Sequence, residues 1–104
     1  MAWKYVIVRV GAMEIPVIFP GVIVHAQMAE SLKDIFAEHV FAASGGYMSA
    51  DSLEKVRSEV VPVSAGETNI LCYSANGFSE SLGIASRPQD ATIISSHPYT
   101  GGHL

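Results

Sequence analysis

The sequence predicts an α+β fold in which a mainly antiparallel sheet, made from an N-terminal and a C-terminal β-hairpin, packs against one main amphipathic helix. Three observations predict this fold. Residues 3–19 are rich in β-branched and aromatic side chains, residues 27–43 carry hydrophobic side chains at helical spacing, and Asn76-Gly77 follows another β-rich run. One or two short helices complete the expected domain, which at 104 residues is long enough to bury its own core.

The N-terminal hairpin is expected from two β-rich runs, Trp3–Val10 and Met13–Phe19, which Gly11-Ala12 separates. Pro16 lies in the second run and has no N–H group to donate to a neighbouring strand. We therefore expect this strand to lie at the edge of the sheet or to be bulged at the proline.

The main helix is predicted from Gln27 to about Ala43, and Gly45-Gly46 ends it. Its acidic and basic side chains occupy the face opposite the apolar one. The side chains expected to face the core are Met28, Leu32, Ile35, Phe36, His39 and Val40. A short helix is predicted next, capped by Ser49 and ending near Ser58; the alternative is a strand that begins around Val56.

Two further strands are expected in the second half of the chain, at Val60–Ala65 and Asn69–Ser74. Pro62 again indicates an edge or a bulge in the first of them. Asn76-Gly77 is the strongest short hairpin signal in the chain, because both central residues of that turn type need positive φ. The returning segment, Phe78–Ile84, is polar and is expected to leave the sheet early.

A last helix is predicted from a capping box, in which Ser86 is the N-cap and Gln89 reaches back to it. This helix is expected to end near Ser95. The predicted compact domain spans residues 1–98, and residues 99–104 are expected to form a flexible tail.

Charged residues make up 15% of the chain, below the average of about 25%, while 49% of the residues are hydrophobic and the mean hydropathy is +0.31. So few charges predict an exposed apolar surface that a second copy or another partner covers, and we expect a homo-oligomer. The net charge is −4, and the six Lys and Arg residues are scattered. Nucleic-acid binding is not expected, because it needs clustered positive charge.

The apolar run Tyr5–Val24 is interrupted by Arg9 and Glu14, so we expect neither a membrane span nor a signal peptide. Cys72 is the single cysteine, which excludes an internal disulfide and fits a reducing compartment. The sequence therefore predicts a soluble, cytoplasmic protein that does not bind membranes.

The best candidate site lies in the segment 79–90. A helix N-terminus and the fork of Arg87 together suit a phosphate or carboxylate, so the predicted ligand is a small anion such as a signalling nucleotide. The alternative is a purely structural cap in which Arg87 pairs with Glu80 or Asp90 on the surface. The predicted ligand-binding residues are Tyr73, which offers a ring face, and Ser79, Ser81, Ser86 and Arg87.

The sequence does not match the catalytic and metal-binding motifs that we compared it with. Cys72 is expected to be a small core residue in the middle of a strand, not a nucleophile. The four histidines have no ligand-pair spacing, so no metal and no cofactor is expected. Gly77-Phe78-Ser79-Glu80-Ser81 lacks the final glycine of a hydrolase elbow. An enzyme would need His25 or Cys72 to converge in space with the serine segment.

The chain resembles small accessory proteins of phages and prophages. The resemblance rests on its small size and acidity and on the segments Ser64-Ala65-Gly66, Ser79-Glu80-Ser81-Leu82 and Ser86-Arg87-Pro88. It implies a non-enzymatic role against host factors, either by blocking a defence complex through direct contact or by sequestering a signalling nucleotide. Three hypotheses follow: a homo-oligomeric binding protein, a protein that captures a small anion, and a small enzyme.

Overall fold

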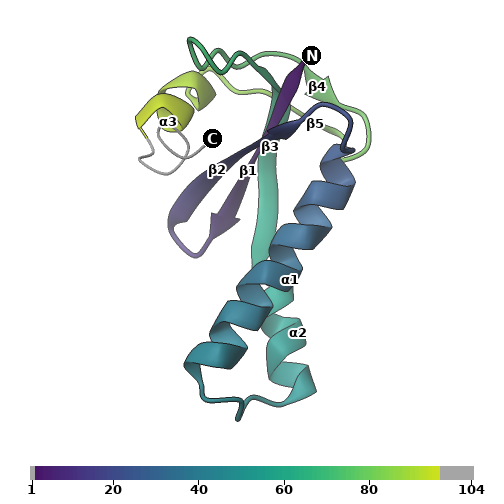
Figure 1. Cartoon of the computed structure of the whole chain (residues 1–104), viewed down its shortest axis with the longest axis vertical. Helices are drawn as coiled ribbons and strands as arrows, with labels where there is room; N and C mark the ends of the chain where they lie inside the picture. The colour runs from purple at the N-terminus through teal and green to yellow at the C-terminus, as the bar shows by residue number, and fades with distance from the viewer. Residues whose placement is uncertain (1, 97–104) are drawn as a thin grey trace.

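The computed structural model describes residues 2–96 and has the α+β fold that the sequence predicts. Antiparallel strands form one main sheet and one small hairpin, and helices lie beside the sheet and below it (Figure 1). The predicted tail 99–104 lies outside the described residues. In chain order the elements are β1 (Trp3–Val10), β2 (Met13–Pro20), α1 (His25–Ala43), α2 (Ala50–Ser58), β3 (Val60–Thr68), β4 (Phe78–Ser79), β5 (Ile84–Ala85) and α3 (Asp90–Ser96).

The main sheet has the strand order β2-β1-β3, and both strand pairs are antiparallel. β1 is central because its run of β-branched and aromatic side chains can be buried on both faces, and Tyr5–Val8 are completely buried. The predicted hairpin of β1 and β2 is confirmed, with Val10 opposite Met13 across the turn Gly11-Ala12.

Both strand prolines lie where the sequence predicts. Pro16 is in the edge strand β2, and Pro62 is in the other edge strand, beside a β-bulge at Ile7–Val8. Val10 and Met13 flank a two-residue turn and form a hydrogen-bonded pair, so the position of Pro16 opposite Ile7 is a non-hydrogen-bonded one. The backbone position at which Pro16 lacks an N–H therefore faces the outer edge of β2, where no strand of the described residues pairs.

The two faces of the sheet carry separate hydrophobic clusters. The first face, which we call the α1 face, packs against α1. Its buried cluster consists of Val6, Val8, Phe19, Val60 and Ala65 of the sheet together with Leu32 of α1. The second face, which we call the α3 face, packs against α3 and contains Tyr5, Ile7, Ile18 and Ile94. Alternation along β1 produces this division, because successive side chains of a strand point to opposite faces.

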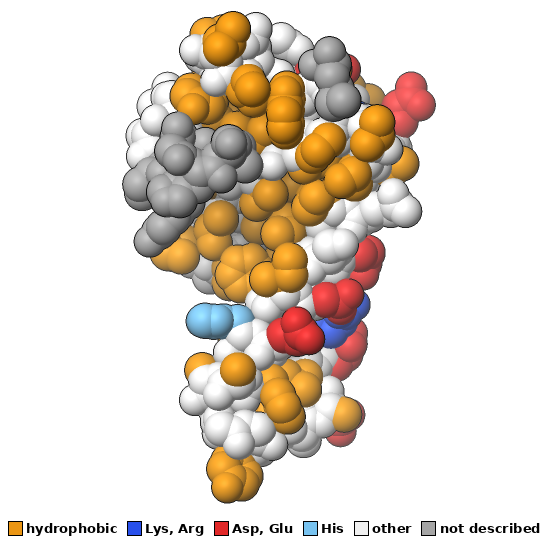
Figure 2. Space-filling model, in the orientation of Figure 1, with side chains coloured by type: hydrophobic (Ala, Val, Ile, Leu, Met, Phe, Trp, Pro, Cys, Tyr) orange, Lys and Arg blue, Asp and Glu red, His pale blue; other side chains and the backbone are white. Residues whose placement is uncertain are grey.

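α1 begins at His25, two residues before the predicted start, and buries His25, Ala29, Leu32 and Ala37. The prediction that Ile35 and His39 face the core is wrong: both are exposed, and Ile35 keeps 56% of its surface. α1 contacts β1 and β3 but leaves much of β2 uncovered. Hydrophobic side chains consequently spread over one side of the molecule, with few charges among them (Figure 2).

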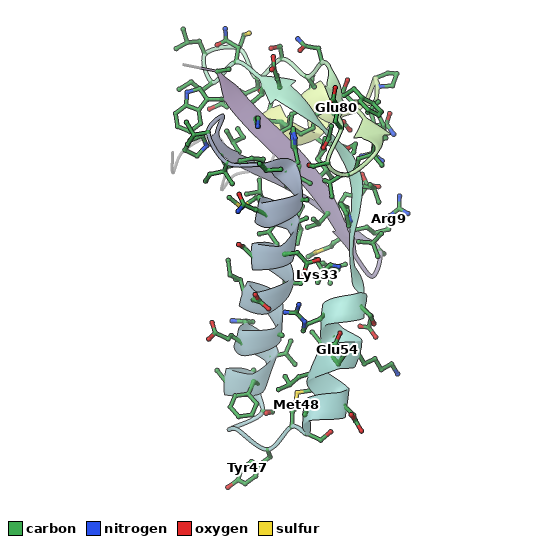
Figure 3. The ribbon with its side chains drawn as sticks, turned by 90° about the vertical axis from the view of Figure 1, so that its right-hand side faces the viewer. Arg9, Lys33, Tyr47, Met48, Glu54 and Glu80 are labelled. Atoms are coloured by element: carbon green, nitrogen blue, oxygen red, sulfur yellow. The ribbon has the colours of Figure 1, made fainter. Side chains whose placement is uncertain are left out.

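The second half of α1 and the whole of α2 extend beyond the sheet as a helical arm, which makes the molecule 42 Å long and 28 × 25 Å across (Figure 3). The predicted short helix is confirmed, and the Ser49 hydroxyl accepts a hydrogen bond from the Ser52 N–H at 3.2 Å. α2 has no buried residue. Arg57 joins the two helices through ion pairs with Glu30 and Asp34.

The predicted strand Asn69–Ser74 is wrong, because the chain forms turns there. The Asn69 side chain accepts from the Leu71 N–H, and its carbonyl accepts from Cys72 and Tyr73. These local bonds satisfy the backbone without a strand partner. Cys72 is consequently exposed, and the prediction of a core cysteine is wrong.

The C-terminal hairpin exists, but its turn is not at Asn76-Gly77 as predicted. Asn76 forms an isolated bridge with Glu67 on β3, and β4 then pairs with β5 across a loop of residues 80–83. Gly77 has the expected positive φ of 99°, but Asn76 does not. One glycine in the left-handed region redirects the chain without making the tight turn.

The predicted cap of the last helix is also wrong, because α3 begins at Asp90 and not after Ser86. The Ser86 hydroxyl donates instead to the Gly77 carbonyl at 3.2 Å. The Asp90 carboxylate accepts from the Arg87 backbone N–H at 2.9 Å, so an acid at the helix start replaces the predicted serine cap.

A substitution at Gly66 would test how closely β3 packs against Asn76. A Cβ atom at Gly66 would overlap the Asn76 carbonyl, so we expect Gly66→Ala to lower the free energy of unfolding by about 2–3 kcal/mol. Gly83→Ala is the matched control: Gly83 has a φ of 69° but open space around it, so backbone strain alone should cost about 1 kcal/mol. Urea denaturation measures both variants; equal losses would contradict the overlap at Gly66.

Candidate functional site

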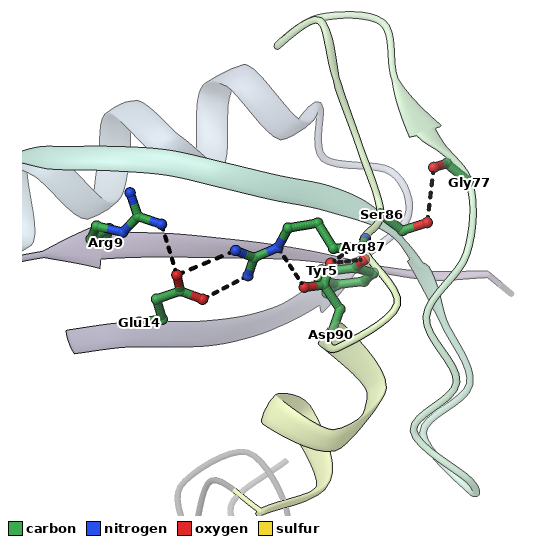
Figure 4. A network of polar contacts seen from close by, with 7 residues as sticks. All are labelled: Tyr5, Arg9, Glu14, Gly77, Ser86, Arg87 and Asp90. Carbon is green, nitrogen blue, oxygen red and sulfur yellow. Dashed lines mark hydrogen bonds and ion pairs between the residues drawn. The ribbon is translucent and has the colours of Figure 1, made fainter. Parts of the chain in front are cut away.

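Arg87, the centre of the predicted ligand site, lies in an ion-pair network on the α3 face (Figure 4). Its guanidinium donates two hydrogen bonds to the Glu14 carboxylate, at 2.6 and 3.2 Å, and one to Asp90 at 3.0 Å. Arg9 also donates to Glu14, at 2.9 Å. The guanidinium fork is therefore engaged by two carboxylates of the protein itself.

Asp90 is completely buried and accepts three hydrogen bonds. The shortest is from the Tyr5 hydroxyl at 2.6 Å, and the other two are from the backbone and the guanidinium of Arg87. A buried carboxylate is tolerated only when it is paired and hydrogen-bonded, and here both conditions are met. The network thus fixes α3 against the central strand.

The electrostatics of the network follow from these contacts. The hydrogen bonds from Arg87 and then Arg9 lower the pKa of Glu14 to about 2, because they stabilise the charged carboxylate. The bond to Glu14 raises the pKa of Arg87. Burial, followed by the bond to Asp90, raises the pKa of Tyr5 well above its usual range. All three shifts hold the groups in the protonation states that the network needs.

Ser79 and Ser81 lie on the other face of the sheet, at the start of α1. The N-cap residue of α1, Val24, has no side-chain oxygen, and the Ser81 hydroxyl accepts from the Ala26 N–H at 3.1 Å. Ser79 is buried and accepts from the Leu82 N–H at 3.2 Å, which fixes the loop between β4 and β5. A serine distant in sequence therefore caps the main helix.

His25 lies next to these serines and is 94% buried, since only 6% of its surface is exposed. Its Nε2 is 3.0 Å from the Gly66 carbonyl. Because a carbonyl can only accept, this nitrogen carries the proton and donates. The ring of Phe19 meets the His25 ring edge-on, with centroids 5.4 Å apart. These contacts hold the start of α1 against β3.

His25 and the serine segment thus converge in space, as the enzyme hypothesis requires, but they do not form a catalytic pair. Among the described residues, neither the Ser79 nor the Ser81 hydroxyl is hydrogen-bonded to the His25 ring. The exposed Cys72 belongs to the turn region that follows β3. Within residues 2–96, the His25 ring and the two serine hydroxyls are therefore engaged by backbone groups.

A cavity of about 510 Å³ opens beside His25 and Ser81. Its lining includes Glu67 and Glu80 but only one ammonium group, that of Lys4. Lys4 in turn donates to the Ile23 carbonyl at 2.9 Å. Two carboxylates make this cavity a poor match for the anionic ligand that the sequence predicts.

The five predicted ligand-binding residues do not gather in one pocket. Ser79 and Ser81 belong to the α1 face, while Arg87 belongs to the α3 face. Ser86 is bonded to the Gly77 carbonyl, and Tyr73 packs in the cluster of the α3 face with a φ of 52°. Their role in binding a ligand stays a prediction.

Sequence reasoning missed Glu14 and Tyr5 as partners of the network. One signal was available: the hairpin register places Arg9 directly opposite Glu14, and both interrupt an apolar run. No sequence signal links Glu14 to Arg87, because 73 residues separate them.

Three further observations bear on function. Among residues 2–96 there is no group of three or more His, Cys, Asp and Glu side chains that could hold a metal. No helix of the described part of the chain is long and apolar enough to cross a membrane. A scan of protein-family models, a search of characterised proteins and a search of solved structures each found no match.

We predict that Arg87→Ala destabilises the fold by about 3–5 kcal/mol, because it leaves the buried Asp90 without its cation and Glu14 with Arg9 alone. Arg9→Ala is the matched control. Arg9 is half exposed, so its ion pair with Glu14 should contribute at most about 1 kcal/mol. Thermal and urea unfolding of both variants check this prediction, and similar losses would contradict it.

Glu14 should make stability depend on pH. Its folded-state pKa lies below the ordinary value of 4.5, so its contribution is complete above about pH 4.5 and is lost as the pH falls toward 2. We expect Glu14→Gln to cost about 1.5–3 kcal/mol at pH 7 and to flatten this acid dependence. Urea denaturation at pH 7, 4 and 3 measures both effects. The control Glu38→Gln, exposed on α1 and outside the network, should keep the wild-type slope.

Proposed function

We propose that this chain is a non-enzymatic binding protein that acts through protein contacts as a homo-oligomer. The observation that carries the proposal is the extent of exposed hydrophobic surface on a chain with few charges (Figure 2). Large side chains of this kind seldom gather on the surface of a monomer without serving as an interface. Those more than half exposed are Met13, Val22, Ile35, Tyr47, Leu71 and Phe78.

The shape of the molecule also supports an interaction protein. Its radius of gyration is 14.1 Å, against about 13 Å for a compact domain of this length. The larger radius of gyration reflects the projecting arm, whose second helix, α2, has no buried residue. Tyr47 lies at the tip of the arm and is 90% exposed (Figure 3). A projecting arm offers surface for contacts that the fold itself does not use.

The bonds of His25 to the Gly66 carbonyl and of Ser81 to the Ala26 N–H use these side chains in the fold, which supports a role in binding over one in catalysis. The resemblance to small phage accessory proteins extends the proposal to inhibition of a host defence factor by direct contact, inside the cytoplasm. The engagement of Arg87 by Glu14 and Asp90 favours this form over capture of a small anion, because the guanidinium is already paired.

Oligomerisation is the part of the proposal that a single measurement tests. We expect sedimentation equilibrium between about 1 and 100 µM, which covers binding free energies of about 5.5 to 8 kcal/mol, to give a weight-average mass above 11.1 kDa that rises with concentration toward a multiple of it. A mass of 11.1 kDa throughout this range would overturn the proposal.

A further inference from the structure

We propose that two copies of this chain associate by packing their α1 helices antiparallel about Ile35, with strand β2 of each copy flanking the contact. This inference rests on the proposed homo-oligomer and names the surface that forms it. The face in question, which we call the Ile35 face, consists of Met28, Ser31, Ile35, His39 and Ala42.

The Ile35 face is a second stripe along α1, beside the one that packs on the sheet. Its residues follow one another at intervals of three, four, four and three, which places them on one side of a helix. All are exposed except Met28, which is half-buried, and none carries a carboxylate, an ammonium or a guanidinium group. A stripe on one side of an exposed helix can pack against a second helix through interdigitating side chains.

The Ile35 face is complementary to itself. In an antiparallel pair with Ile35 at the two-fold axis, Met28 of one copy lies opposite Ala42 of the other, and Ser31 lies opposite His39. Each of these pairs combines a large side chain with a small one, which lets two helices approach closely and interdigitate. α1 suits this contact because its 19 residues extend for about 28 Å and Ile35 lies near the middle.

Strand β2 extends the apolar surface beside α1. Ile15 and Val17 are only partly buried and pack against the same hydrophobic cluster as Met28. Both belong to the α1 face of the sheet, which α1 covers at β1 and β3. A second α1 lying beside the first would cover this remaining part of the sheet.

The distribution of charge decides which face of α1 two copies can bring together. The chain has a net charge of −4, so two copies repel each other unless uncharged surfaces meet. The neighbouring face of α1 is acidic, with Glu30, Asp34 and Glu38, and would face its own like charges in a symmetric pair. Contact through the Ile35 face keeps these carboxylates away from the centre of the interface.

Pairing through the edge of β2 is the competing way to join two copies, and the prolines oppose it. Pro16 and Pro20 both occupy positions whose backbone faces the outer edge of β2, and neither has an N–H group to donate. Contact through the helix face requires no backbone donors. The geometry therefore favours helix packing over an extended sheet.

The first test is Ile35→Glu, with Leu71→Glu as the matched control. Both positions hold exposed aliphatic side chains, but Leu71 lies in the turn after β3, outside the Ile35 face. We expect Ile35→Glu to weaken association at least about 30-fold, as for a central interface residue, because it buries two like charges at the axis. Leu71→Glu should associate like the wild type. Circular dichroism monitors folding in both.

The second test is a cross-link at the axis, made in a Cys72→Ser background. Ile35→Cys places two thiols opposite each other at the axis of the proposed pair, and we expect mild oxidation to give a disulfide-linked dimer, since a disulfide needs Cα atoms about 4.4–6.8 Å apart and closely packed helices allow this separation. Asp34→Cys, one residue away and turned by about 100°, is the control and should cross-link much less.

The outcomes separate this inference from the proposed function. Wild-type protein that stays at 11.1 kDa overturns both. Wild-type protein that oligomerises, with Ile35→Glu associating equally well or with equal cross-linking at positions 34 and 35, overturns only the Ile35 interface. Loss of association in Ile35→Glu alone, together with a dimer specific to Ile35→Cys, supports it.

Discussion

The pairing of Arg87 with the buried carboxylate of Asp90 is the interaction on which the C-terminal part of the fold depends. Asp90 is completely buried, and a carboxylate in that position costs several kcal/mol unless a cation and hydrogen-bond donors satisfy it. Arg87 supplies the cation and also reaches Glu14 on β2, while Tyr5 donates from the central strand. This single requirement joins α3, the segment before it and the N-terminal hairpin. Besides this network, α3, which is only seven residues long, is held against the sheet by the burial of Ile94 among Tyr5, Ile7 and Ile18.

The segment from β4 to α3 stabilises both faces of the sheet. On one face it carries Arg87; on the other, the Ser81 hydroxyl caps α1, whose own N-cap residue, Val24, cannot do so. His25 adds a buried bond to β3. Hydroxyls and a guanidinium gathered in one stretch of sequence resemble a ligand site, yet here they satisfy polar groups of the protein. Residues that bind ligands and residues that cap helices use the same hydrogen-bond chemistry, so composition alone does not separate them.

The arrangement of α1 on the sheet concentrates the uncharged surface of this chain in one region. α1 lies over β1 and β3, so the hydrophobic side of β2 remains partly uncovered. The charges that the chain has are used on the arm, where Arg57 pairs with Glu30 and Asp34, and in the network around Arg87. What remains between β2 and α1 is therefore apolar. The composition predicts an exposed apolar surface, and the position of α1 over β1 and β3 determines where that surface lies.

The sequence by itself determined β1, β2, α1 and most of β3, and it favoured α2 over a strand from Val56, because alternation, helical spacing and a serine cap depend on residues within one turn or one strand. It also located both strand prolines, since a missing N–H excludes a central strand. Tertiary structure decided the rest. Asn69–Ser74 has the composition of a strand, but β3 offers it only the bridge between Glu67 and Asn76, so local bonds prevail. The candidate site was least predictable, because Glu14, the second partner of Arg87 beside Asp90, is 73 residues distant and only the folded chain brings the two charges together.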